Sequence, residues 1–341
     1  MVAMSMETQK YWSAATSLWR DPSVRSWILV NPTSIADTWA VCALARSFKE
    51  THGGPLTMIM KQSQAPIAEM YAHNIDRILV YEDQQLLSFC WKLYGTGTFD
   101  IDSPIVAHPY WHGPGQHFND VAELFGFPGR GGIKFADWMR IPLRLPWEST
   151  LDQPVIPDLW REAAKVYAEE VGLEQGNSVI LFPDNNSQPP LPMQVWDDLA
   201  AELRKLGKKV FTNMAGNRFG ARTEPVAGTH PIQVDLRLAI PLVELAGRFV
   251  AMSNGLSSML TGCKVRAEHT YLILKPLPDE PMYVNEHLLK NPVLIQSQEI
   301  IGFGDGPWHE YVIEAGTDYS QVIRDAAANN LDAAFQLFPR R

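Results

Sequence analysis

The sequence predicts an α/β protein with two nucleotide-fold domains whose parallel sheets face a shared cleft. Short apolar runs alternate with stretches of helical period along most of the chain. The chain has 341 residues, 46% of them hydrophobic, which suffices for two cores. Two polar strand-to-helix loops, residues 34–37 and 253–258, lie one in each half. Because ligands bind outside the carboxyl ends of parallel strands, these loops predict two walls of one binding site.

The first half reads as strands and helices in the order β-α-β-α-β. Residues 27–30 are a short apolar run that ends at Asn31-Pro32, which is typical of a buried strand followed by a turn. Residues 38–51 carry their apolar side chains mostly on one helix face, and a glycine pair follows them. We further expect strands at 56–60, 77–81 and 103–107, and helices at 66–73 and 118–125. This order requires a parallel sheet with right-handed crossovers.

A second α/β unit follows a connector rich in proline and glycine, residues 126–158. We expect its strands at 178–182, 209–212, 249–252 and 271–274, its helices at 160–171, 193–206, 241–247 and 257–263, and a tail helix at 319–338. The domains are therefore expected at residues 1–150 and 151–310. A C-terminal helix within residues 311–341 is expected to pack back on the first domain.

Charge, apolar runs and cysteines exclude several classes of protein. The formal net charge of -9 argues against nucleic acid as a partner, because phosphate-backbone binding needs clustered cations. No apolar run approaches the length of a transmembrane helix, and residues 1–10 lack the pattern of a signal peptide. Cys42, Cys90 and Cys263 are widely spaced and form no CxxC pair, which favours the reducing cytoplasm. Peripheral contact with a membrane or a partner protein stays open.

Four segments, in order, resemble one family. They are residues 31–45 (Asn-Pro-Thr-Ser-Ile-Ala-Asp-Thr-Trp and onward), 74–79, 182–199 with its Trp196, and 240–260 with its glycine loop. Their order and spacing hold over about residues 25–265. The chain resembles glycosyltransferases of the GT-B architecture, closest to the bacterial heptosyltransferases of family 9, which use nucleotide-activated heptose. The resemblance implies two facing Rossmann-like domains, the first for the acceptor and the second for the nucleotide sugar.

The chain departs from the pattern of this family at four positions. Ala36 stands where the family has glycine, Pro190 where it has a phosphate-binding lysine, and Ser253 and Ser258 where it has Asp and His. The donor phosphates are therefore expected to meet hydroxyls, amides and a helix N-terminus. Because one charge-assisted hydrogen bond contributes about 1.5–3 kcal/mol, the missing lysine argues for a sugar other than heptose.

Asp37 has two interpretations. From the residues alone it is a helix N-cap, since Asp often precedes a run of helical period. The resemblance implies a general base, which takes the proton of an acceptor hydroxyl as that oxygen attacks the anomeric carbon and contributes roughly 10²–10⁴-fold. The two roles are compatible. Ser34, in the same loop, is expected on the acceptor side.

The resemblance also implies that the donor is bound by loops of the second domain, where the structural alternative is an ordinary polar turn. A glycine at position 255 lets the backbone approach a diphosphate closely, and the helix start behind it favours anions. The expected donor-binding residues are Asp184, Asn185, Ser187, Gln188, Met214, Gly216, Asn217, Ser253, Asn254, Gly255, Leu256, Ser257 and Ser258.

A histidine-containing segment follows the expected strand at 103–107. His108, His112 and His117 are separated by prolines and glycines, so no helix presents them on one face. We therefore expect no metal site, which needs about three ligands held by further hydrogen bonds. His108 and His112 are expected in a loop that binds an acceptor hydroxyl or carboxylate, with a structural role as the alternative. No cofactor is expected besides the nucleotide sugar, which is a substrate.

The expected reaction is an inverting, metal-independent transfer of a hexosyl or heptosyl group from a nucleotide sugar to an acceptor hydroxyl. One alternative is a nucleotide-sugar epimerase or hydrolase, which needs a second carboxylate or histidine; Glu244 and His108 are available. Another is a catalytically silent homologue that binds a ligand or a partner enzyme. The acceptor stays open among lipid-linked glycans, proteins and small molecules.

Overall fold

The computed structural model describes residues 27–31, 35–84, 86, 106–107, 140, 143, 145–184, 190–215, 223–252, 254–261, 268–275, 308–314 and 318–329 of the 341. These residues divide into two compact units: unit 1 ends at Val155, and unit 2 begins at Ile156. The division falls a few residues after the expected domain boundary between residues 150 and 151.

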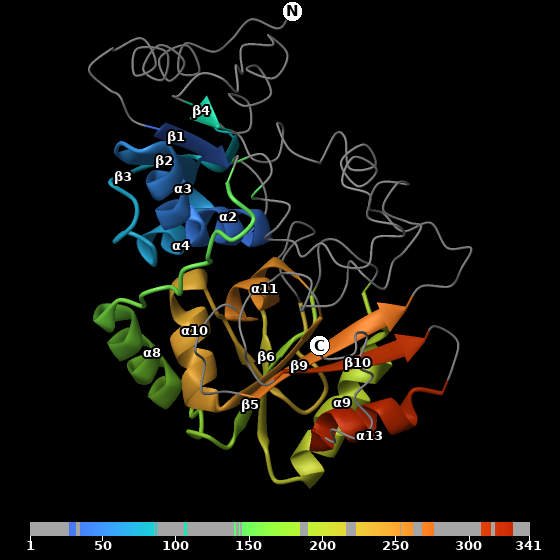
Figure 1. The fold of residues 1–341 in the computed structure, drawn as a ribbon. Helices are drawn as coiled ribbons and strands as arrows, with labels where there is room; N and C mark the ends of the chain where they lie inside the picture. Colours follow the sequence, from blue (N-terminus) through green and yellow to red (C-terminus); the bar gives the residue numbers. More distant parts are fainter. Residues whose placement is uncertain are drawn as a thin grey trace, which may run out of the picture. The chain divides into compact units, whose positions relative to one another are not determined.

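In unit 1, the described strands form one sheet with the order β3-β2-β1-β4 (Figure 1). They are β1 (Trp27–Asn31), β2 (Leu56–Lys61), β3 (Arg77–Tyr81) and β4 (Val106–Ala107). Every pair is parallel, as the alternation of strands and helices predicted. The first five residues of β2 are all buried, which is why all of them except Thr57 are apolar.

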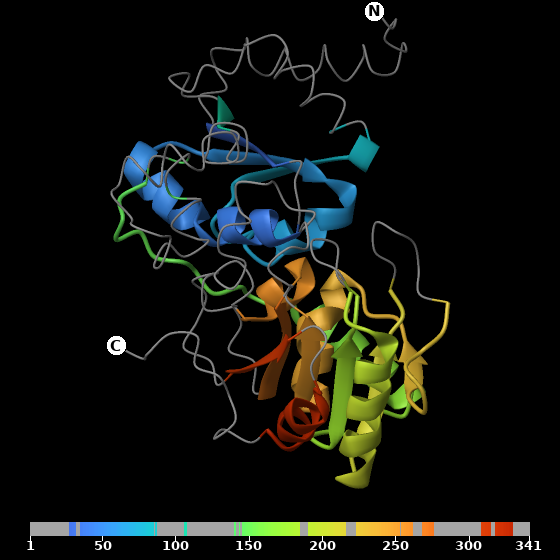
Figure 2. The ribbon, with the colours of Figure 1, turned by 90° about the vertical axis from the view of Figure 1, so that its right-hand side faces the viewer.

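The described helices of unit 1 are α2 (Ile35–Ala43), α3 (Ala45–His52) and α4 (Ala65–Glu69), and they lie on one face of the sheet (Figures 1 and 2). The prediction of a single helix over residues 38–51 was wrong, because the chain bends at Leu44, with φ of -93° and ψ of 0°. The bend separates α2, buried from Thr38 onward, from α3, which carries solvent-facing polar residues. Trp39 anchors α2 in the core by packing edge-on against Tyr71, at 5.3 Å between ring centres.

In unit 2, the described strands form a parallel sheet with the order β10-β9-β8-β5-β6-β7. They are β5 (Ser178–Phe182), β6 (Lys209–Asn213), β7 (His230–Ile232), β8 (Arg248–Met252), β9 (Glu268–Lys275) and β10 (Trp308–Glu314). The sequence predicted four of these strands and missed β7 and β10. The short edge strand β7 contains Pro231, which has no N–H to donate.

Helices cover both faces of the unit 2 sheet. They are α8 (Asp158–Glu170), α9 (Met193–Lys205), α10 (Leu236–Ala246), α11 (Gly255–Thr261) and α13 (Ser320–Ala328). Alternate strand residues such as Val179 and Leu181 belong to one buried cluster with α9 and α13, around Trp196. Helices α8 and α10 pack together on the other face (Figure 1). Two-sided burial explains why β5 and β8 are apolar after their first residues, Ser178 and Arg248.

The tail helix is shorter than expected and packs on unit 2. Helix α13 ends at Ala328 because Asn329 adopts a left-handed conformation, with φ of 51°. The buried Arg248 side chain donates to the carbonyl of Ala327 at 2.6 Å and to Asn329 Oδ1 at 2.9 Å, which holds this helix end. Residues 330–341 and the expected helix at 118–125 lie outside the described residues, so packing of the last segment on the first domain stays a prediction.

Nowhere in the described residues does a helix have the length and apolarity needed to cross a membrane.

Candidate functional site

The strand order of unit 2 defines a ligand-binding edge. The chain runs outward from β5 through β6 to β7, and then returns to place β8, β9 and β10 on the other side of β5. The order therefore reverses between β5 and β8. In open parallel sheets, ligands bind outside the carboxyl ends of the strands at this reversal. The loops after Phe182 and after Met252 begin there.

The loop after β8 is closed by a reciprocal pair of hydrogen bonds. Asn254 Oδ1 accepts from the Ser257 N–H at 2.8 Å, and Ser257 Oγ accepts from the Asn254 N–H at 2.8 Å. This arrangement is a capping box at the start of α11, with Asn254 as the N-cap. Ser257 is only 1% exposed, so its hydroxyl serves the loop itself.

Asn254 also connects the two loops at the reversal point. Its Nδ2 donates to the carbonyl oxygen of Asp184 at 2.8 Å. Asp184 lies two residues after β5, and Asn254 two residues after β8. A single amide side chain therefore caps α11 with its oxygen and holds the β5 loop with its nitrogen. Asn254 is only partly buried.

Asn213 joins the next two loops along the same edge in a similar way. Its Oδ1 accepts from the Ala215 N–H and from the Val234 N–H, both at 3.1 Å, and the residue is 7% exposed. The Met214 N–H donates to the carbonyl of Ile232 at 2.7 Å. Asn213 was not among the residues predicted from the sequence. An asparagine at the last position of a strand, before a turn, is a signal that could have found it.

The structure brings together several of the expected donor-binding residues at this edge. Asp184, Met214, Asn254, Gly255, Leu256 and Ser257 follow β5, β6 and β8 at their carboxyl ends, and Ser258 continues α11. Asn185, Ser187, Gln188, Gly216, Asn217 and Ser253 lie outside the described residues. Contact of these residues with a donor stays a prediction.

Asp37 lies at the corresponding edge of the unit 1 sheet, whose order reverses between β1 and β4. It is partly buried in the first turn of α2, where the helix dipole favours a carboxylate. The N-cap interpretation is wrong, because α2 already begins at Ile35. The next residue, Thr38, donates to Gln64 Oε1 at 2.6 Å and fixes this turn against the segment after β2. Ser34, His108 and His112 lie outside the described residues.

Glu244 does not lie at the candidate edge. It forms an ion pair with Arg161, between α10 and α8, just before β8 begins at its amino end. Within the described ranges, no group of three or more His, Cys, Asp or Glu residues could hold a metal ion. Metal independence stays a prediction.

No protein-family model matches this sequence, and no curated protein matches it. Solved structures do match. One is the glycosyl transferase family 9 protein from Veillonella parvula, with 14% identity, a TM-score of 0.51, and 90% of this chain and 92% of that chain covered. Another is the E. coli ADP-heptose lps heptosyltransferase II, with 13% identity, a TM-score of 0.50, and 84% and 90% covered.

At this level of identity the likeness concerns the fold. The chain has the α/β fold with parallel sheets of the GT-B glycosyltransferases, and in its fold it is similar to family 9 and heptosyltransferase structures. The fold class predicted from the sequence is confirmed. The facing arrangement of the two domains stays a prediction.

Proposed function

We propose that the protein transfers a sugar from a nucleotide-sugar donor to an acceptor hydroxyl. The observation that carries this proposal is the contact from Asn254 to the Asp184 carbonyl, which joins two loops at the strand reversal of unit 2. Such an edge is where nucleotides bind in Rossmann-like sheets. The likeness of the fold to glycosyltransferases supports sugar transfer as the reaction.

In this proposal the donor diphosphate binds beside the start of α11 and the loop that begins at Asp184. The first turn of a helix offers unpaired N–H groups and a favourable dipole to anions. Pro190 provides no cation, so binding relies on the backbone amides of these loops, whose shape Asn254 and Ser257 hold. The base and ribose lie toward Met214 and the residues that follow it.

The proposed chemistry needs one carboxylate on the acceptor side. Asp37 accepts the proton of the acceptor hydroxyl while that oxygen forms a bond to the anomeric carbon. The bond from the anomeric carbon to the diphosphate breaks, and the nucleoside diphosphate leaves with the electron pair. Attack opposite the leaving group inverts the anomeric centre.

The epimerase alternative is weaker, because Glu244 is paired with Arg161 and lies near the amino end of β8. A silent homologue would bind a nucleotide sugar without consuming it. A thermal-shift panel of nucleoside diphosphates and nucleotide sugars, applied to the whole chain, identifies the donor, since a ligand at 100 times its Kd stabilises by about 2.7 kcal/mol.

The preferred donor is then incubated with lipid-linked glycan, protein and small-molecule acceptors, and products are sought by mass spectrometry. We expect an acceptor heavier by one sugar and the free nucleoside diphosphate in equal amount. Stabilisation by a donor without any product or release would favour the silent homologue. A panel in which no nucleotide ligand stabilises the protein would contradict the proposal.

A further inference from the structure

A hollow lined by basic side chains lies at the opposite end of the unit 2 sheet. It is placed where α9 ends and where β6 and β7 begin, at the amino ends of the strands. Its volume of about 420 Å³ is in the range of small-molecule sites. The residues that matter for its chemistry are Glu174, Arg204, Lys208, Lys209, Gly228 and His230.

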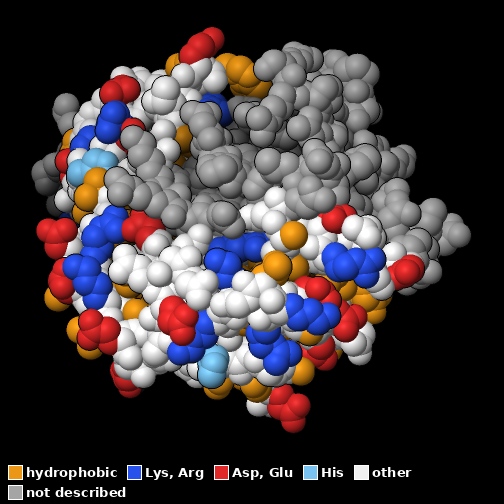
Figure 3. All heavy atoms as spheres, turned by 90° about the horizontal axis from the view of Figure 1, so that it is seen from below, with side chains coloured by type: hydrophobic (Ala, Val, Ile, Leu, Met, Phe, Trp, Pro, Cys, Tyr) orange, Lys and Arg blue, Asp and Glu red, His pale blue; other side chains and the backbone are white. Residues whose placement is uncertain are grey.

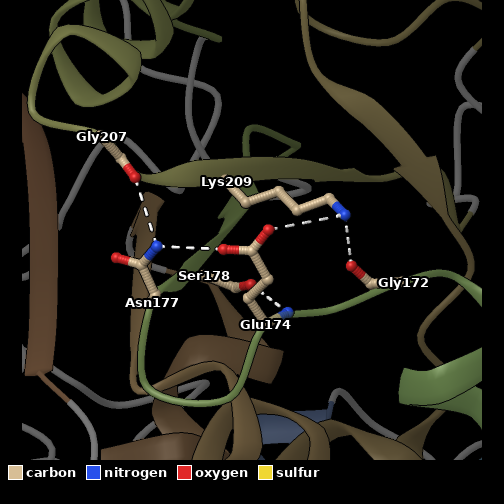
Figure 4. A network of polar contacts seen from close by, with 6 residues as sticks. All are labelled: Gly172, Glu174, Asn177, Ser178, Gly207 and Lys209. Carbon is tan, nitrogen blue, oxygen red and sulfur yellow. Dashed lines mark hydrogen bonds and ion pairs between the residues drawn. The ribbon is translucent and has the colours of Figure 1, made fainter.

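One wall of the hollow is a network in which Lys209 and Glu174 balance each other (Figure 4). Lys209 Nζ donates to the carbonyl of Gly172 and lies 3.9 Å from Glu174 Oε1. Asn177 Nδ2 donates to Glu174 Oε2 at 3.0 Å and to the carbonyl of Gly207 at 3.3 Å. The Glu174 carboxylate and the Lys209 ammonium therefore already have partners in this network.

Two other cations of the hollow, Arg204 and Lys208, have no counter-ion within the described part of the chain. Arg204 Nε donates to the carbonyl of Ala200 at 3.3 Å, which orients the side chain. Among the residues that the structure describes, neither Arg204 nor Lys208 forms an ion pair. The Arg204 guanidinium lies against Gly228, where an added Cβ would overlap it. The guanidinium can therefore occupy this position because Gly228 has no side chain.

We propose that this hollow binds the phosphate group of a small phosphate monoester. A guanidinium offers two parallel N–H donors that match a phosphate, and a neighbouring ammonium adds a second positive charge. Arg204 and Lys208 together match the charge of a phosphate dianion. The exposed ring of His230 is held 5.5 Å from the ring of Phe211 and provides a further N–H at the rim.

The surroundings favour a small ligand over a membrane surface. At the end of unit 2 where α9 ends, seen from below, Lys and Arg side chains are interspersed with Asp and Glu (Figure 3). Lys205, on the last turn of α9, is paired with Glu202 at 2.7 Å. Anionic lipid is typically recognised by clusters of about 4–8 Lys and Arg residues. The chain as a whole carries a formal net charge of -9.

The test monitors an NMR signal of His230, at the rim of the hollow, in the whole protein. The His230 ring carbon signal is observed by NMR, assigned by its loss in His230→Gln, during titration with inorganic phosphate and with methyl phosphate. The pH is held constant. Chloride keeps the ionic strength constant, so that the screening of charges does not change during the titration. We expect a saturable shift of this signal with both probes.

Arg204→Gln and Lys208→Gln should each weaken binding at least about tenfold, because each removes a charge-assisted contact. Lys205→Gln is the matched control, since it removes one positive charge from the residue next to Arg204, which is paired with Glu202 and does not line the hollow, and it should bind as the wild type does. Three results would overturn the proposal. They are no saturable shift in the wild type, equal affinity in Arg204→Gln and Lys205→Gln, and a response to phosphatidic acid vesicles but to neither small phosphate. The readout uses no glycosyl transfer and is independent of the proposed function.

Discussion

At the residue scale, Asn254 holds the candidate donor site together. Its oxygen caps α11 through the Ser257 N–H, and its nitrogen reaches the Asp184 carbonyl across the reversal point of the sheet. The sequence selected Asn254 and Ser257 as phosphate ligands. The structure adds a role in the shape of the loop, because the Ser257 hydroxyl both accepts from and donates to the Asn254 backbone.

Asn254→Ala should weaken donor binding by roughly tenfold or more. The change removes the cap, which contributes about 0.5–2 kcal/mol, and the contact to Asp184, so both loops lose their common anchor. Calorimetric titration with the preferred nucleoside diphosphate measures the effect. Asn177→Ala is the matched control, because Asn177 makes two similar contacts near the amino end of β5. Equal affinities of the two variants for the nucleoside diphosphate would show that the donor binds at another site.

Asp37→Asn should abolish transfer while leaving donor affinity nearly unchanged. The substitution keeps the size of the side chain in the first turn of α2 but removes the base, whose contribution is roughly 10²–10⁴-fold. Steady-state kinetics with the identified donor and acceptor give kcat, and calorimetry gives the donor Kd. Turnover above about a tenth of the wild-type value would rule out the general-base role.

Some residues of the site could be predicted from the sequence and others could not. Asp184 and Asn254 were selected because each lies two residues after a buried strand, in a recognisable strand-to-helix loop. The contact between them depends on β5 and β8 being neighbours, which no local pattern states. The contact of Asn213 with Val234 could not be predicted for the same reason, since Val234 follows a strand that was itself not predicted.

At the element scale, Gly247 fixes the connection from α10 to β8. Its φ is +90°, and an added Cβ would lie 2.9 Å from the Cα of Gly176. Gly207, which follows α9, has a φ of +76° with nothing within 4 Å of an added Cβ. Gly207→Ala should therefore cost about 1–2 kcal/mol of left-handed strain alone. Gly247→Ala should cost about 1–3 kcal/mol more, from overlap with backbone.

Urea unfolding of both variants measures this difference, with equal m-values as the check that the unfolding reaction is the same. Equal losses of stability in Gly207→Ala and Gly247→Ala would show that the close approach of Gly176 is unimportant.

Asp76 should make the stability of unit 1 depend on pH. Hydrogen bonds from Lys49, at 2.7 Å, and from the Leu56 N–H, at 2.6 Å, lower the pKa of its carboxyl. A lowered pKa in the folded state stabilises above the unfolded pKa, and the effect is lost as pH falls through the folded value. Asp76→Asn should therefore be less stable than the wild type at pH 7, and the difference should shrink toward pH 3. A difference that stays constant over this range contradicts the assignment.

Elements with two-sided burial were predictable, and short edge elements were not. Strands β5 and β8 are buried throughout, so their apolar runs indicated them directly. Strand β7 has three residues, of which only Ile232 is buried, so it leaves no such run. The bend at Leu44 was also missed, since apolar residues continue through it without a proline or glycine.

At the scale of the whole molecule, strand order places the candidate sites. Both described sheets run outward over consecutive strands and then return to the other side of the first strand. The alternation of strands and helices predicted parallel sheets, but it could not predict which strands are neighbours at the edge. This strand order could be expected only from the resemblance of the sequence to GT-B glycosyltransferases, and the structural comparisons support that fold.

The central claim is that a nucleotide sugar binds at the carboxyl ends of β5, β6 and β8. Hydrogen exchange of the whole chain, with and without the preferred nucleotide sugar, tests it most directly, because bound ligand protects the amides that it covers. We predict protection in peptides that cover residues 183–190, 213–217 and 253–258, with none in residues 204–210 at the other end of the sheet. Protection confined to unit 1, or to residues 204–210, would contradict the account.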